Sequence, residues 1–203
     1  KDPKRISSLT DKSIDFMKDQ VEADKPFYLQ LSHYAMHIWH DSHKETREKY
    51  MKLPKSKKHI AKDDLPESEI PVAMFNHGWI INYAAMLDDV DRALGKLLDS
   101  LDELGISENT YVVFTSENGG GFRGNRPLKE GKGSLYEGGI RMPSLVTGPN
   151  IEKGSYCDVP VVQWDFLQTF YDLAGGKDPL PKDLDGGSLR DVFEKGNLGR
   201  VKR

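Results

Sequence analysis

The stretch from Thr110 to Pro143 reads T-Y-V-V-F-T-S-E-N-G-G-G-F-R-G-N-R-P-L-K-E-G-K-G-S-L-Y-E-G-G-I-R-M-P. It opens with a β-branched and aromatic run that is typical of a buried strand. Glu117 and Asn118 follow, and three glycines then leave the backbone free to turn both side chains toward one ion. Carboxylate and amide oxygens are hard donors, which suit calcium or magnesium. The pattern allows a metal-binding loop, but on local sequence alone an ordinary polar strand exit is the favoured interpretation.

Two glycine motifs in this stretch resemble nucleotide-binding motifs without their context. Residues 119–124 match G-x-G-x-x-G, but Asn-Arg-Pro follows where a helix should open, so we reject a dinucleotide site. Lys132 lies in G-K-G and is followed by Gly133, whereas a phosphate-binding P-loop needs Ser or Thr there. Lys132 is either a compact positive charge that flanking glycines leave open to an anionic group, or a solvent-exposed lysine.

The sequence predicts an α/β fold in which helices flank a mainly parallel sheet. The strongest helix signal covers residues 80–104, where apolar residues recur every three or four positions and Gly105 follows as a C-cap. Further helices are expected at 8–23, capped by Thr10 or Asp11, and at 44–51 and 161–173, and strands at 27–32, 111–115 and 144–147. Residues 52–66 are rich in lysine and predict a surface loop, or a contact for an anionic substrate.

Acidic residues accumulate on the polar side of the expected helix at 80–104. They are Asp88, Asp89, Asp91, Asp99 and Asp102. Their helical spacing points several of them outward, so a solvated face is favoured over a metal cluster.

Four of the six histidines lie within eleven residues after the expected strand at 27–32. They are His33, His37, His40 and His43, and their spacing would fit one face of a helix. A zinc site is the alternative, but the chain has no H-E-x-x-H pattern. One functional histidine with surface neighbours is therefore the favoured interpretation.

The composition of the chain limits the classes of partner that it could bind. A net charge of −3 gives no argument for nucleic acid, and no apolar run approaches the length of a membrane span. The single cysteine, Cys157, excludes an internal disulfide and a cage of several cysteines for zinc. The opening K-D-P-K-R lacks the apolar region of a signal peptide. We expect neither a nucleic-acid nor a membrane partner.

The order of these segments resembles a sulfatase, a member of the alkaline phosphatase superfamily. The segments that carry the resemblance are K-P-F-Y-L-Q-L-S-H-Y-A-M-H at 25–37, the run from 83 to 120, and G-K-G-S-L-Y-E-G-G-I-R-M-P at 131–143. D-F-L-Q-T-F-Y-D-L-A-G at 165–175 and L-D-G-G-S-L at 184–189 also have counterparts in the family. The resemblance covers nearly the whole chain, and the block at 131–143 is highly specific.

The resemblance implies a sulfuric ester hydrolase and gives four residues their roles. Glu117 and Asn118 would bind a calcium or magnesium ion. Lys132 would bind the sulfate group and its bridging oxygen. His37 matches the family's catalytic histidine, which hydrogen-bonds sulfate or assists the leaving group. The substrate would be a sulfated small molecule or glycan, and the compartment would be periplasmic, secreted or lysosomal.

The chain also departs from the family's pattern. Glu117 replaces the usual Asp, Ile38 replaces the usual Pro, and the formylglycine segment C/S-x-P-x-R and the first pair of metal-binding aspartates are absent. Residues 1–203 thus resemble part of a catalytic domain without its nucleophile or its small C-terminal subdomain. We expect this chain alone to be inactive and to expose a sheet edge through which it could associate. A phosphoryl- or phosphonate-ester hydrolase, or a non-enzymatic domain, remains the alternative.

Overall fold

The computed structural model describes residues 1–53, 77–121, 127–199 and 201. The chain forms two compact units, Lys1–Ser107 and Glu108–Arg203, and each is described by itself. Most of the lysine-rich segment at 52–66 lies outside the described residues, as do Phe122, Arg123 and Gly124 of the glycine motif.

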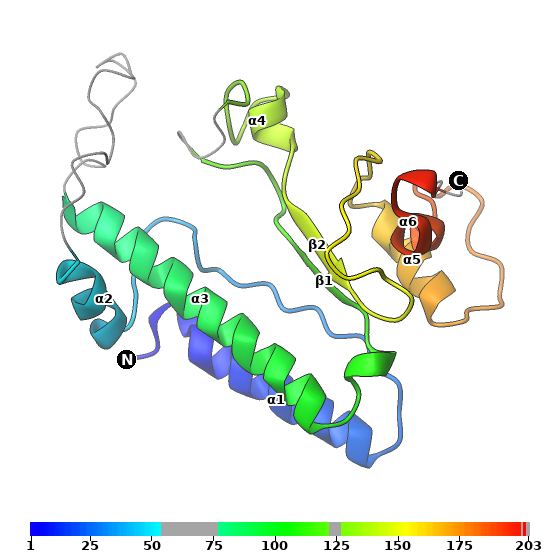
Figure 1. The fold of residues 1–203 in the computed structure, drawn as a ribbon, viewed down its shortest axis with the longest axis horizontal. Helices are drawn as coiled ribbons and strands as arrows, with labels where there is room; N and C mark the ends of the chain where they lie inside the picture. The colour runs from blue at the N-terminus through cyan, green and yellow to red at the C-terminus, as the bar shows by residue number, and fades with distance from the viewer. Residues whose placement is uncertain (54–76, 122–126, 200, 202–203) are drawn as a thin grey trace. The chain divides into compact units, whose positions relative to one another are not determined.

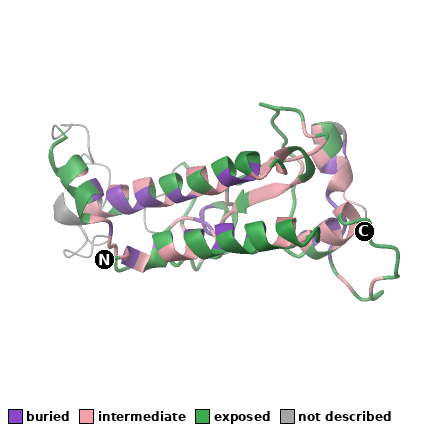
Figure 2. Ribbon diagram, turned by 90° about the horizontal axis from the view of Figure 1, so that it is seen from below, coloured by how far each residue is buried: buried purple, intermediate pink, exposed green. Residues whose placement is uncertain are grey.

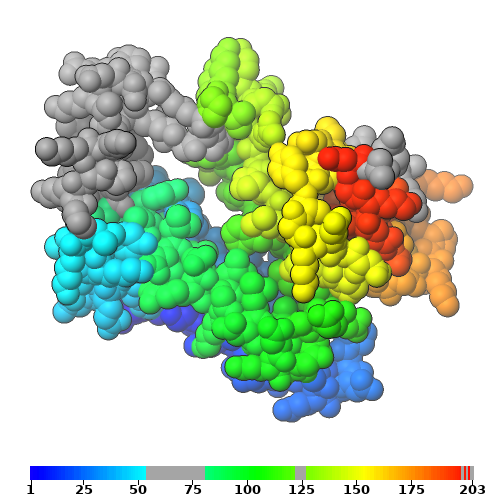
Figure 3. Space-filling model, in the orientation of Figure 1, coloured from blue at the N-terminus to red at the C-terminus, as the bar shows by residue number. Residues whose placement is uncertain are grey.

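The first unit is built on one long helix. This helix is α3 (His77–Glu103), and η1 (Pro3–Arg5), α1 (Ile6–Glu22) and α2 (Lys44–Met51) precede it. Both α1 and α2 pack against α3 (Figure 1), and the space-filling view shows α2 directly against α3 (Figure 3). Buried and exposed residues alternate along the long helices (Figure 2), as one apolar face requires. The core centres on Ile6, Met86 and Ala93.

The helix boundaries confirm most of the sequence pattern. The apolar spacing correctly predicted α3. Gly105 follows its end with φ +69°, and the Gly105 N–H donates a hydrogen bond of 3.0 Å to the Asp102 carbonyl. The predicted cap of α1 is wrong. The Asp2 carboxylate accepts the N–H groups of Ser7 and Ser8 at 3.0 Å each, so the helix begins earlier than predicted. Thr10 lies inside the helix, where its hydroxyl donates to the Ile6 carbonyl.

The predicted strand at 27–32 is wrong for this structure. Residues 25–43 contain neither helix nor strand and run as a long open trace beside the helices (Figure 1). A strand needs a neighbour to satisfy its backbone groups, and the described residues of this unit contain no other strand. The histidines that follow do not form a helix, because 35–39 is a series of turns and bends.

The second unit contains a two-stranded sheet and short helices. β1 (Val112–Thr115) pairs antiparallel with β2 (Ser144–Thr147), and Phe114 lies opposite Leu145. Both strands lie where the sequence predicts them. The helices are α4 (Glu137–Ile140), α5 (Asp165–Leu173) and α6 (Arg190–Lys195), with η5 (Ser107–Asn109) at the unit boundary and η6 (Gly196–Leu198) at the end.

Parallel pairing was predicted, and the strands that the structure describes pair antiparallel instead. The described part of this unit contains only β1 and β2, and β2 runs in the direction opposite to β1, so no parallel pair forms among the described residues. Phe114 and Leu145 are 41% and 64% exposed, which leaves one face of the sheet largely uncovered. Association through the sheet edge stays a prediction.

Candidate functional site

In the second unit, glycines allow the backbone of residues 116–121 to approach that of residues 127–141 closely. The Gly119 N–H donates to the Gly139 carbonyl at 2.8 Å, and the Lys132 N–H donates to the Gly120 carbonyl at 2.8 Å. A Cβ atom on Gly119 would lie 2.1 Å from the Gly138 carbonyl oxygen, far inside van der Waals contact. Only glycine permits this approach. The exit of β1 and the G-K-G and E-G-G motifs therefore form one backbone assembly.

Glu117 and Asn118 lie side by side at the exit of β1, as the sequence predicts. The Asn118 amide Nδ2 donates to Glu117 Oε1 at 2.6 Å, and the Ser116 hydroxyl donates to Oε2 at 3.3 Å. Lys132 Nζ lies 3.9 Å from Oε1. A hydrogen bond from Glu117's own backbone amide holds the pKa of its carboxylate below the usual value, and Asn118, Ser116 and Lys132 act in the same direction. The carboxylate therefore stays charged at neutral pH.

This pair fits part of a hard-cation site. An ionised carboxylate beside an amide oxygen is the donor chemistry that calcium and magnesium prefer. The Glu117 side chain is 74% exposed, so an ion can reach it. Six or more oxygens usually surround calcium. Among the described residues no group of three or more His, Cys, Asp or Glu side chains could hold a metal. Glu117 and Asn118 would thus supply only part of a metal-binding shell.

The positive groups of this region have different surroundings. The Lys132 side chain is 49% exposed and lies near the Glu117 carboxylate. Arg141 instead pairs with Glu137 at 3.8 Å, one helical turn apart. Lys129 Nζ lies over the Tyr136 ring, 3.7 Å from its centroid. Lys132 is the lysine that the loop holds beside the candidate metal ligands.

His37 belongs to the first unit and lies on its surface. Its Nδ1 is 2.8 Å from the Ile38 carbonyl, and its ring lies 5.2 Å from that of Tyr34. The exposed ring is accessible for hydrogen bonding or proton transfer. Burial lowers the pKa of His33 and of His40, so burial favours the neutral form of both.

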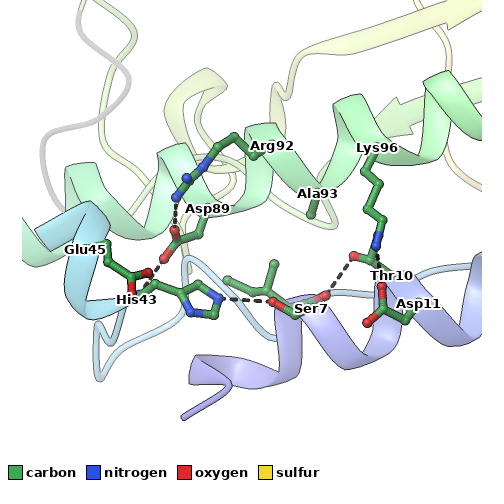
Figure 4. A pocket seen from close by; sticks show the side chains of 10 residues that line it. Ser7, Thr10, Asp11, His43, Glu45, Asp89, Arg92, Ala93 and Lys96 are labelled. Carbon is green, nitrogen blue, oxygen red and sulfur yellow. Dashed lines mark hydrogen bonds and ion pairs between the residues drawn. The ribbon is translucent and has the colours of Figure 1, made fainter. Parts of the chain in front are cut away.

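A polar pocket of about 340 Å³ lies between α1, α2 and α3 of the first unit (Figure 4). Asp89 is buried there, which corrects the prediction that it lies on a solvated face. Its carboxylate accepts from the His43 N–H at 2.7 Å, the Thr46 hydroxyl at 2.6 Å and Arg92 at 2.7 Å. His43 also contacts the Ser7 hydroxyl at 3.1 Å. These residues satisfy one another's hydrogen-bonding groups, which indicates that they link the helices structurally.

The outward positions of the remaining acidic residues on α3 agree better with the sequence. Asp91, Asp99 and Asp102 are exposed, as predicted. Asp88 is largely covered and pairs with Lys49 at 2.5 Å. Helical spacing correctly predicted that three of these aspartates are exposed. The other two, Asp88 and Asp89, lie where α2 packs against α3 and covers this face.

Comparison with known proteins identifies the family. A family model described as Sulfatase matches residues 6–176. The chain belongs to the sulfatase family. A sulfatase from Formosa agariphila is 30% identical over 95% of this chain and 34% of its own length. Human steryl-sulfatase is 34% identical over 55% of this chain and 21% of its own length. The chain therefore spans about a third or less of these curated relatives.

Solved structures confirm the fold class of this sulfatase chain as α/β and alkaline-phosphatase-like. Ps i-CgsB, crystallised with k-i-k-neocarrahexaose, superposes with a TM-score of 0.75 and 30% identity over 95% of this chain and 39% of its own. PsFucS1 sulfatase from Pseudoalteromonas sp. gives 0.71 and 27% identity over 96% and 35%. Sulfatases generally use a metal ion and a formylglycine. No described helix is long and apolar enough to cross a membrane.

Proposed function

We propose that these residues belong to a metal-dependent sulfuric ester hydrolase and supply part of its site. The observation that supports this proposal is the approach of Lys132 Nζ to within 3.9 Å of Glu117 Oε1, in a loop that only glycines can form. A cation and a candidate metal carboxylate thus adjoin one another on a shared backbone assembly. Because a sulfate ester is anionic, its hydrolysis gains from fixed positive charge near its oxygens.

Each of the four candidate site residues has a defined role in this proposal. Glu117 and Asn118 hold a calcium or magnesium ion through their side-chain oxygens. That ion, when bound, withdraws charge from the sulfate oxygens. Lys132 donates N–H groups to the sulfate group and its bridging oxygen. His37 hydrogen-bonds sulfate or protonates the leaving oxygen. The nucleophile would come from residues other than these 203.

The substrate would be a sulfated small molecule or glycan. One structural neighbour, Ps i-CgsB, was crystallised with an oligosaccharide, and the family model supports sulfate chemistry. A relative from Drosophila melanogaster is called an extracellular sulfatase. We accordingly propose a periplasmic, secreted or lysosomal compartment for this protein.

The test is hydrolysis by the protein that carries this chain. Aryl sulfate, aryl phosphate and aryl phosphonate are compared, each before and after removal of divalent ions with EDTA. The proposal predicts preference for the sulfate ester, loss of turnover with EDTA and recovery with calcium or magnesium. Preference for phosphate or phosphonate would favour the alternative hydrolases, and no turnover of any ester would favour a non-enzymatic domain.

A further inference from the structure

The turn before α5 is bonded to the loop that carries the candidate metal ligands. The Gln163 amide Nε2 donates to the Ser116 carbonyl oxygen at 2.8 Å, across 47 positions of the sequence. The same nitrogen lies 3.6 Å from the Met142 sulfur, just after the E-G-G motif. Ser116 directly precedes Glu117, so this bond reaches the backbone next to the first candidate ligand.

The backbone around Gln163 is held firmly in place. Asp165 is fully buried, and its carboxylate accepts the Val162 N–H at 3.0 Å and the Gly187 N–H at 2.9 Å. The Asp165 N–H in turn donates to the Val162 carbonyl at 3.0 Å. These bonds close a turn around Gln163 and join it to residues far along the chain. Gln163 therefore extends from a fixed base, although its own side chain is exposed.

The two candidate ligands lie between two anchors. On the far side, the Gly119 N–H bonds the Gly139 carbonyl at 2.8 Å. On the near side, the Ser116 carbonyl accepts from Gln163. Only Glu117 and Asn118 separate these anchored residues. Holding both ends of so short a segment reduces the conformational freedom that ion binding would otherwise remove, which favours affinity.

We propose that Gln163 is a positioning residue for the metal loop: its hydrogen bond to Ser116 orients Glu117 and Asn118 for a divalent cation. The proposal rests on the proposed function only in taking Glu117 and Asn118 as cation ligands. Gln163 touches neither the ion nor the substrate in this account. It acts through the backbone, so its loss should weaken cation binding without removing a ligand.

The experiment measures terbium(III) binding by luminescence, with calcium competition, in the protein that carries this chain. Gln163→Leu removes the donor and keeps a side chain of similar bulk. Gln163→Glu keeps the length but presents an ionised carboxylate to the carbonyl. Since one neutral hydrogen bond contributes roughly 0.5–1.5 kcal/mol, both variants should bind terbium about twofold to tenfold more weakly. Gln168→Leu, in helix α5 directly after that turn, is the control and should keep wild-type affinity.

Each result decides the proposal. Weaker terbium binding and an altered luminescence lifetime in both Gln163 variants, with Gln168→Leu unchanged, would support it. Unchanged affinity in the Gln163 variants would overturn it, even if their melting temperatures fell. Equal weakening in Gln168→Leu would also overturn it. A Glu117→Gln variant separates the two claims, because unchanged terbium affinity in that variant would reject the metal ligands of the proposed function themselves.

Discussion

The backbone N–H of Gly119 donates to the carbonyl oxygen of Gly139 at 2.8 Å, which joins the exit of β1 to the E-G-G motif. The contact brings the backbone at Gly119 so close to residues 138–139 that a Cβ atom would meet the Gly138 oxygen at 2.1 Å. The placement of the candidate metal ligands therefore depends on a residue that carries no side chain.

Substitution of this glycine should open the loop. Gly119→Ala forces the two segments apart, so we expect a loss of roughly 1–3 kcal/mol in unfolding free energy, typical of overpacking. Gly121→Ala is the matched control, because its Cβ would meet nothing within 4 Å. Chemical denaturation of both variants measures the difference. Equal stability of the two alanine variants would contradict the close approach.

The charge of Glu117 should govern cation affinity. Glu117→Gln keeps the shape but removes the negative charge, and we expect binding of calcium to weaken roughly tenfold to hundredfold. Glu130→Gln, an exposed carboxylate in the same loop, serves as control. Calorimetric titration of both variants gives the comparison. An equal effect of the two substitutions would mean that only overall charge matters.

The buried carboxylate of Asp89 should stabilise the packing of α2 on α3. It is 3% exposed and accepts hydrogen bonds from His43, Thr46 and Arg92. Asp89→Ala leaves these donors without their acceptor, so we expect a loss of roughly 2–3 kcal/mol in unfolding free energy. The exposed Asp91→Ala should change it by less than about 0.5 kcal/mol. Thermal unfolding distinguishes the two.

Acid should weaken the contact between Asp88 and Lys49. A hydrogen bond from Lys49 is the main cause that lowers the pKa of Asp88 below its ordinary 3.8 in the folded chain. The folded state thus favours the ionised carboxylate. This stabilisation is fully present above the unfolded pKa and is lost as the pH falls through the folded pKa. Stability measured from pH 6 downward should show this loss.

Two variants test whether the Asp88 carboxylate causes this loss of stability at low pH. Asp88→Asn cannot titrate at this position, so the part of the stability loss that this carboxylate causes should disappear. Lys49→Met should remove the same part, because Lys49 supplies the bond that lowers the pKa. If both variants lose as much stability in acid as the wild type does, other carboxyl groups cause that loss.

Local patterns predicted the helices and strands wherever the residues themselves decide the structure. The apolar spacing of α3 and the β-branched run of β1 depend on neighbouring positions, so both were predicted from sequence. The segment at 27–32 has the composition of a strand, but the residues of its unit that the structure describes offer no partner strand, and pairing cannot be inferred from composition. The cap of α1 was missed because Asp2 stands well before the residue that the pattern suggested.

The candidate site shows the same difference between features set by local sequence and features set by contacts to distant residues. Glu117, Asn118 and Lys132 were predicted as site residues from the family resemblance, and the structure places them together. Gln163 was missed, because its bond to Ser116 spans 47 positions and has no periodic signal. The only hint was Q-W-D ahead of a helix, where the aspartate fixes a turn. Long-range hydrogen bonds of this kind require coordinates.

The measurement that tests the central claim most directly is kcat/KM for an aryl sulfate in Lys132→Met and Lys129→Met variants of the protein that carries this chain. Lys132 would bind the sulfate group, whereas Lys129 lies over the Tyr136 ring. We predict that Lys132→Met lowers kcat/KM roughly a hundredfold or more, as loss of a charge-stabilising donor does. Lys129→Met should stay within about threefold of wild type, a free-energy difference below 1 kcal/mol. Equal activity of the two variants would contradict the account.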